Sequence, residues 1–150
     1  MSDGAQSMIV LVEDNPADVY LFRMALQNAG VNFELLVIED GAEALAFARQ
    51  GGKYAGNRAP DLIVLDLNLP KNGGVEVLRV MRDNPHFAKA PVVVASSSAS
   101  PRERADAERL GAARHIVKPP DLDSFLQIGV ALKEVLLAHR DGNSSVSPPL

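Results

Sequence analysis

The chain has 150 residues, a formal net charge of −4 and no cysteine. This length fits one domain whose core is stable without cross-links, and the lack of cysteine excludes disulfides, thiolate catalysis and sulfur-ligated zinc. The acidic balance, without a basic cluster, argues against a nucleic-acid surface. Because no signal peptide or membrane-length apolar run is present, we expect a soluble, cytoplasmic protein that binds neither membranes nor nucleic acid.

Five short apolar runs predict β-strands. They cover residues 8–12, 33–38, 62–67, 91–95 and 115–117. Helical patterns lie between them, so strands and helices alternate along the chain, which is typical of an α/β fold with a parallel sheet covered on both faces. The runs are almost continuously apolar, as expected for strands that are buried on both sides.

The predicted helices begin at recognisable capping residues. Their starts are Asn15-Pro16, Asp40 with Glu43, Gly73-Gly74, Ser100-Pro101 with Glu103, and Asp121. Gly30 ends the first helix and the last runs to about His139. We expect a loose N-terminus over 1–7, one domain over 8–138 and a disordered, Pro/Ser-rich tail over 139–150.

Polar side chains follow four of the five predicted strands. Glu13 and Asp14 come after the first, Asp66 ends the third, Ser96 follows the fourth and Lys118 follows the fifth. In open parallel sheets the carboxyl ends of the strands form the ligand site. Taken singly, each residue has a simpler explanation, since an Asp at a strand end usually shapes a turn or caps a helix.

Taken together, these residues predict a phosphoryl-transfer site. Three carboxylates about 4 Å apart repel one another by several kcal/mol at an effective dielectric of about 20, so a cation is needed among them. Carboxylate ligands suit Mg²⁺, and Lys118 adds a fixed positive charge. The central carboxylate, Asp66, is the predicted nucleophile, with Mg²⁺, Lys118 and Ser96 on the oxygens of the transferred group.

The Glu13-Asp14 pair, Asp66 in DLIVLDLNLP, Ser96 in PVVVASS and Lys118 in HIVKPP resemble the signature of response regulator receiver domains of bacterial two-component systems. The resemblance spans residues 8–138. It implies a flavodoxin-like fold, (βα)5 in three layers, with parallel strand order 2-1-3-4-5. It also implies phosphorylation of Asp66 in a phosphorelay without turnover of an external substrate.

The resemblance also implies roles for individual residues. Mg²⁺ would be bound by Asp14, Asp66 and the backbone carbonyl of Asn68, with Glu13 acting through water. Ser96 would be the switch hydroxyl, and His115 stands where the family usually has a switching Tyr or Phe. His115 is alternatively a half-buried strand residue without a switch role. The bond between Lys118 and Pro119 is often cis in this family.

Partners are suggested by the same likeness and by the last helix. The stretches VEDNPADV and LDLNLPKNGG look most like stand-alone receivers that partner phytochrome-type histidine kinases. Phe22 and Asp18 are candidate kinase contacts beside the acid pair, with ordinary packing as the alternative for Phe22. Apolar residues cover an unusually wide arc of the last helix, which favours a homodimer through the surface of the fourth helix, fifth strand and fifth helix. The alternative is that the extra apolar residues rest under the tail, because Lys133 lies inside the same arc. We expect phosphorylation to switch the surface of the fourth helix, fifth strand and fifth helix, which is then itself the output.

Three other functions remain open on the sequence. A shuttle or phosphate sink in a phosphorelay needs the same residues as a receiver with its own output. A phosphohydrolase of the haloacid dehalogenase kind also uses a strand-end Asp and Mg²⁺, but it needs a second acid where this chain has Asn68. A binding module with a vestigial site would have lost the nucleophile or the acids, all of which are present.

Overall fold

The computed structural model describes residues 6–56, 58–70, 73–97 and 100–144. Strands and helices alternate along them, as the sequence predicts. The strands are β1 (Ser7–Val12), β2 (Phe33–Ile38), β3 (Leu62–Asp66), β4 (Val92–Ser96) and β5 (Arg114–Val117). The helices are α1 (Pro16–Asn28), α2 (Gly41–Ala48), α3 (Gly74–Asp83), α4 (Pro101–Arg109) and α5 (Leu122–Ser144), with short 3-10 helices at Gly52–Tyr54 and Pro85–Phe87.

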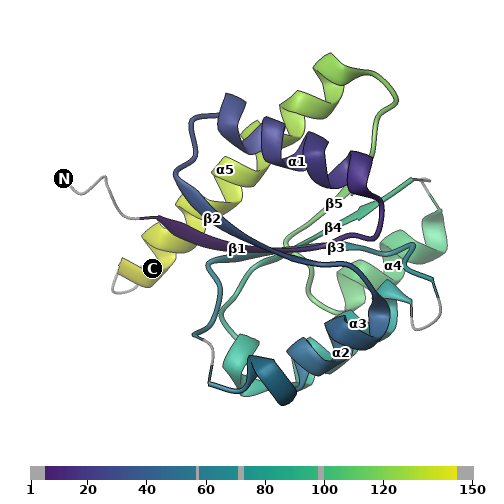
Figure 1. Ribbon diagram of the computed structural model, residues 1–150, viewed down its shortest axis with the longest axis vertical. Helices are drawn as coiled ribbons and strands as arrows, with labels where there is room; N and C mark the ends of the chain where they lie inside the picture. The colour runs from purple at the N-terminus through teal and green to yellow at the C-terminus, as the bar shows by residue number, and fades with distance from the viewer. Residues whose placement is uncertain (1–5, 57, 71–72, 98–99, 145–150) are drawn as a thin grey trace.

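The strands form one parallel sheet in the order β2-β1-β3-β4-β5. Figure 1 shows α1 and α5 on one face of this sheet and α2, α3 and α4 on the other. This three-layer arrangement confirms the predicted flavodoxin-like fold. Within the described residues, no helix is both long and apolar enough to cross a membrane.

Each central strand contributes alternate side chains to two separate cores. In β3, Ile63 and Leu65 pack in the core under α2 and α3, whereas Leu62 and Val64 pack in the core under α1 and α5. All four side chains are buried. Helices cover both faces of the sheet, so nearly every strand position is apolar and a charge at a strand end is conspicuous.

The helix pair α1 and α5 packs closely. A side-chain carbon added at Gly129 would lie 2.0 Å from the carbonyl oxygen of Ala25, so only glycine fits at this crossing. Phe22 meets Phe125 edge-on with ring centroids 5.1 Å apart, and it is 1% exposed. The hypothesis of Phe22 as a kinase contact is therefore wrong. Phe22 lies three and four residues before Ala25 and Leu26, on the buried face of α1.

The ends of the chain differ in detail from the prediction. α5 continues beyond the expected end near His139 to Ser144, and the Arg140 guanidinium donates a hydrogen bond to the Ser7 hydroxyl at the start of β1. This contact ties the last turns of α5 to the sheet, which the polar sequence alone did not indicate. The remaining parts of the predicted loose N-terminus and tail, residues 1–5 and 145–150, lie outside the described residues.

We predict that Gly129→Ala destabilises the protein. Alanine normally favours a helix by about 1 kcal/mol over glycine, but here the added carbon would strike the Ala25 backbone. We expect the free energy of unfolding, measured by urea denaturation, to fall by about 1–3 kcal/mol. Gln127→Ala, at an exposed position on the same helix, should stay within about 0.5 kcal/mol of the parent. Equal stability of the two variants would contradict this packing.

Candidate functional site

The carboxyl ends of β1 and β3 bring the acids together. Val12 and Leu65 are paired in the sheet, so Glu13 and Asp66, the next residue on each strand, lie side by side. One side-chain oxygen from each of Glu13, Asp14 and Asp66 lies within 4.8 Å of the other two. Glu13 is 1% and Asp66 4% exposed, whereas Asp14 is exposed and open to solvent.

This donor set fits a hard divalent cation. It consists of oxygen atoms from three carboxylates, of which that of Asp14 is exposed to solvent. Mg²⁺ is typically bound by one or two carboxylates together with water and a phosphate oxygen. The cluster therefore has the chemistry that the sequence predicted for a metal site at Glu13, Asp14 and Asp66.

Lys118 reaches the same cluster from β5. Its backbone N–H donates to the Ser96 carbonyl at 2.8 Å, which continues the pairing of β5 with β4. Its ammonium group donates to Glu13 Oε1 at 2.8 Å, to Asp18 Oδ2 at 2.8 Å and to Asp66 Oδ2 at 3.2 Å. The predicted cation is thus in direct contact with the predicted nucleophile.

Burial and charge change the proton affinity of two groups in this cluster. The pKa of Glu13 is raised to about 7, mainly by burial; the hydrogen bond from Lys118 opposes this rise and the neighbouring charge of Asp66 adds to it. Burial alone would lower the pKa of Lys118, but its hydrogen bonds to Asp18 and Glu13 raise that pKa above the ordinary value. Lys118 therefore carries its charge at neutral pH.

The loop after β3 fixes the Asp66 carboxylate. The backbone N–H of Asn68 donates to Asp66 Oδ1 at 2.8 Å, so both carboxylate oxygens of Asp66 have a donor. The start of α3 then closes on this strand end, because a side-chain carbon at Gly74 would lie 2.5 Å from the Asp66 carbonyl oxygen. Gly73 and Gly74 were predicted as a helix start, and Gly74 is also required by this close approach.

The Asn68 side chain connects the site to α4. Its Oδ1 accepts hydrogen bonds from the backbone N–H and the hydroxyl of Ser97, at 2.9 and 3.3 Å. Its Nδ2 donates to Glu103 Oε2 at 3.2 Å. The sequence predicted a role only for the backbone carbonyl of Asn68. The contact of its side chain with Glu103 was not predicted, because Glu103 lies 35 positions away in the chain.

The two predicted switch residues contact each other. The Ser96 hydroxyl lies 3.3 Å from His115 Nε2, and Ser96 is fully buried. Burial lowers the pKa of His115, and the nearby Arg104 charge lowers it further. His115 is therefore neutral at pH 7, and its tautomer decides which of the two side chains donates.

The structure brings the predicted site together with one difference and one addition. The peptide bond between Lys118 and Pro119 is trans rather than cis, which is the favoured state of most such bonds, and Lys118 still reaches the acids. Asp18 was considered only as a kinase contact, yet it binds Lys118. Its place in the first turn of the helix that directly follows the acid pair was the signal that could have revealed this.

Comparison with known proteins identifies the family. Residues 9–128 match the response regulator receiver domain. The chain belongs to this family. It is therefore a receiver rather than an enzyme that turns over an external substrate, as the sequence predicted, and the phosphohydrolase alternative is wrong.

The relatives include phytochrome response regulators, again as predicted. Response regulator Rcp1 of Synechocystis sp. is 43% identical over 100 residues, which cover 65% of this chain and 68% of that protein. The structure of the phosphorylated cyanobacterial phytochrome response regulator RcpA is 39% identical, with a TM-score of 0.81, over 97% of this chain and 100% of that one. The Mn²⁺-bound form of Rcp1 is 32% identical, with a TM-score of 0.78, over 96% and 99% of the two chains.

We predict that Glu13 makes the metal-free protein less stable as pH rises from about 4.5 to about 7. In this window folded Glu13 keeps a proton that the unfolded chain has already released, so each pH unit favours unfolding; below the window the effect is absent. The loss amounts to about 3 kcal/mol over the window at about 1.4 kcal/mol per unit.

Urea denaturation in EDTA across this pH range would measure the effect. Glu13→Gln has no proton to lose at this position, so its stability should fall less over the same range. A difference between parent and variant that stays constant with pH would show that Glu13 titrates normally.

Proposed function

We propose that the chain is a response regulator receiver that accepts a phosphoryl group on Asp66 from a sensor histidine kinase. The observation that carries this proposal is the position of Asp66, whose carboxylate lies close to both the acid pair and the Lys118 ammonium. One Asp66 oxygen would form the bond to phosphorus while the bond from phosphorus to the kinase histidine breaks. We take residues 8–138 as the receiver domain.

Mg²⁺ is the metal that we propose for this site. Asp14, Asp66 and the backbone carbonyl of Asn68 would bind it directly, and Glu13 would act through water. When bound, the ion supplies positive charge to the oxygens of the transferred group. The close acid cluster supports this proposal, as do the solved Mn²⁺-bound form of the relative Rcp1 and a receiver domain of a sensor kinase solved with magnesium in its active-site cleft.

The remaining charge would be balanced by residues of the chain itself. Lys118 holds its ammonium group 3.2 Å from Asp66, where it would bind one oxygen of the transferred group. Ser96 would provide a hydroxyl to another oxygen. Because phosphoryl transfer depends mostly on positioning and on stabilisation of charge, these roles need no further acid or base from this chain.

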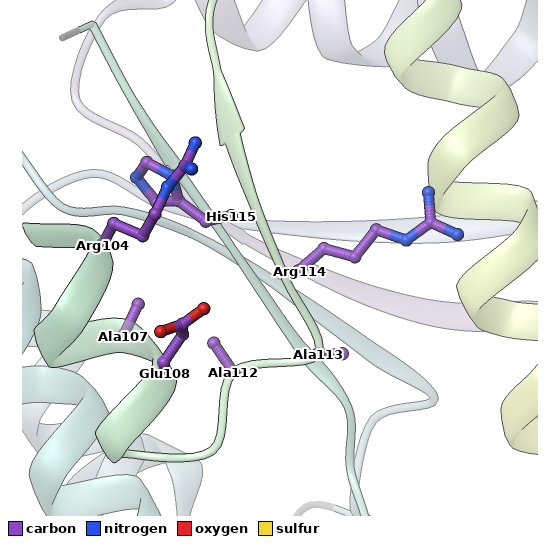
Figure 2. A pocket seen from close by; sticks show the side chains of 7 residues that line it. All are labelled: Arg104, Ala107, Glu108, Ala112, Ala113, Arg114 and His115. Carbon is purple, nitrogen blue, oxygen red and sulfur yellow. The ribbon is translucent and has the colours of Figure 1, made fainter. Parts of the chain in front are cut away.

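Signalling would pass from Ser96 to the surface between α4 and β5. In the present state Ser96 contacts His115, and Figure 2 shows His115 with Arg104 at one end of a surface pocket of about 360 Å³, while Arg114 points the other way, towards α5. If Ser96 turns to a phosphoryl oxygen, its contact with His115 breaks. The phosphorylated and unphosphorylated forms would then differ at this α4-β5-α5 surface.

The kinase partner is proposed to be of the phytochrome type. The relatives Rcp1 and RcpA support this, since RcpA is described as a cyanobacterial phytochrome response regulator. A phosphorelay shuttle or phosphate sink without an output of its own is the alternative. Phosphorylation that changes neither self-association nor the α4-β5-α5 surface would favour the alternative.

We propose a homodimer through α4-β5-α5, with α5 as the main contributor. Leu122, Val130 and Leu137 are between 42% and 49% exposed. At about 100° per residue they lie within about 80° of one another, as one stripe. The Lys133 ammonium, in the same stripe, donates to the Ala29 carbonyl at 3.1 Å, so the stripe extends from the predicted surface towards α1.

We predict that Asp66→Asn abolishes phosphorylation. Incubation of the parent protein with acetyl phosphate and Mg²⁺ should add the mass of one phosphoryl group, detected by intact mass spectrometry, because the Asp66 carboxylate is the nucleophile. Asp83→Asn, at the exposed end of α3, should be modified like the parent. Phosphorylation of Asp66→Asn at the parental rate would refute the assignment.

We predict that Val130→Glu weakens self-association. The substitution places a charge in the exposed apolar stripe of α5, so the sedimentation coefficient of the phosphorylated protein should fall towards that of a monomer at the same concentration. Gln127→Glu adds a charge at another exposed position of α5 and should have a smaller effect. A parent protein that is monomeric at high concentration, phosphorylated or not, would rule out the dimer.

A further inference from the structure

Lys118 is bound by more carboxylates than phosphoryl transfer requires. An ammonium group has three N–H donors, and those of Lys118 are matched by Glu13, Asp18 and Asp66. The contacts with Glu13 and Asp18 are 2.8 Å long, whereas the contact with Asp66 is 3.2 Å. In this state the cation is therefore held more closely by two other acids than by the nucleophile.

Asp18 is well placed to hold that cation. It lies in the first turn of α1, where the helix N-terminus stabilises a negative charge, and its backbone N–H donates to the capping side chain of Asn15 at 3.4 Å. Its side chain is 22% exposed, compared with 10% for Lys118 and 1% for Glu13. The ion pair therefore forms at the mouth of the site and joins α1 to the end of β5.

Asp18 stands outside the acid cluster that suits a metal ion. That cluster consists of Glu13, Asp14 and Asp66 among the described residues. The Asp18 carboxylate binds the Lys118 ammonium through an ion pair that is also a hydrogen bond. Neutralising Asp18 would thus leave the proposed metal ligands and the nucleophile intact while changing the position and the pairing of Lys118.

We propose that Asp18 is a positioning residue that competes with the phosphoryl group for Lys118 and so restrains phosphorylation of Asp66. This inference rests on the proposed function of the site. The ammonium group must turn from its present acceptors to bind a phosphoryl oxygen, and Asp18 opposes that movement. The Asp18 carboxylate also adds negative charge beside a site that must receive a dianionic group, which makes binding of that group less favourable.

The test uses the full chain and two probes, beryllofluoride with Mg²⁺ as a phosphoryl mimic and acetyl phosphate as a donor. Asp18→Asn keeps the shape of the side chain and removes its charge. We expect it to raise the affinity for beryllofluoride, measured by NMR titration, and the rate of phosphorylation, measured by intact mass, by about three- to tenfold, as for the loss of one partly screened charge pair.

Glu39→Gln is the matched control. Glu39 follows β2 at the same edge of the sheet and is exposed, so this variant makes the same change in net charge without touching Lys118. It should show a smaller gain than Asp18→Asn. Asp18→Glu, which keeps the charge, should reverse most of the gain, and higher ionic strength should reduce the difference between the parent and Asp18→Asn.

The outcomes separate this inference from the proposed function. If the parent protein takes up neither beryllofluoride nor a phosphoryl group, the proposed function fails. If the parent reacts and Asp18→Asn is unchanged, slower or matched by Glu39→Gln, competition for Lys118 is wrong. Thermal melts report whether each variant is folded. If Asp18→Asn does not fold, Asp18→Ser gives the same test, because serine suits a helix N-terminus.

Discussion

The site depends on one largely buried ammonium group. Lys118, at the end of β5, is held by the carboxylates of Glu13 and Asp66 at the ends of β1 and β3 and by that of Asp18 in α1. Without Lys118, the charges of Glu13 and Asp66 would lie close together in a region from which water is largely excluded. Their repulsion and the cost of burial would favour protonation or movement of one of them. The cation therefore offsets part of the repulsion between Glu13 and Asp66 within a largely buried cluster.

The parallel sheet supplies the geometry for that ion cluster. Glu13 and Asp66 are neighbours because β1 and β3 are paired, while Lys118 reaches across from beyond β4. Asn68 and Gly74 then fix the chain after β3, the first by a hydrogen bond to Asp66 and the second by allowing α3 to approach. The rigid sheet thus places the charges, and the loops complete the site and connect it to α4 through Asn68 and Glu103.

The Lys118 contacts also connect separate parts of the fold. Asp18 belongs to α1, Glu13 follows β1 and Lys118 follows β5, so one side chain joins a helix and two strand ends. Ser96 lies between this cluster and His115 on the edge strand. Under the proposed function, a phosphoryl group on Asp66 would act on both sides at once, on α1 through Lys118 and on the pocket between α4 and β5 through Ser96.

The sequence by itself determined the elements and the edge at which the chemistry lies. Continuous apolar runs indicated strands buried on both faces, capping residues marked the helix starts, and strand-end acids with Lys118 indicated the charged site. These signals are local, because burial and capping act within a few residues of the chain.

The tertiary structure alone decided which side chains meet across the fold. The pairing of Asp18 with Lys118 spans 100 positions, the burial of Phe22 depends on α5 crossing α1 at Gly129, and α5 is longer than predicted where Arg140 meets Ser7. Such contacts depend on strand order and on the closeness of helix packing. A periodic pattern records that a face is buried, but it does not specify the partner that covers it.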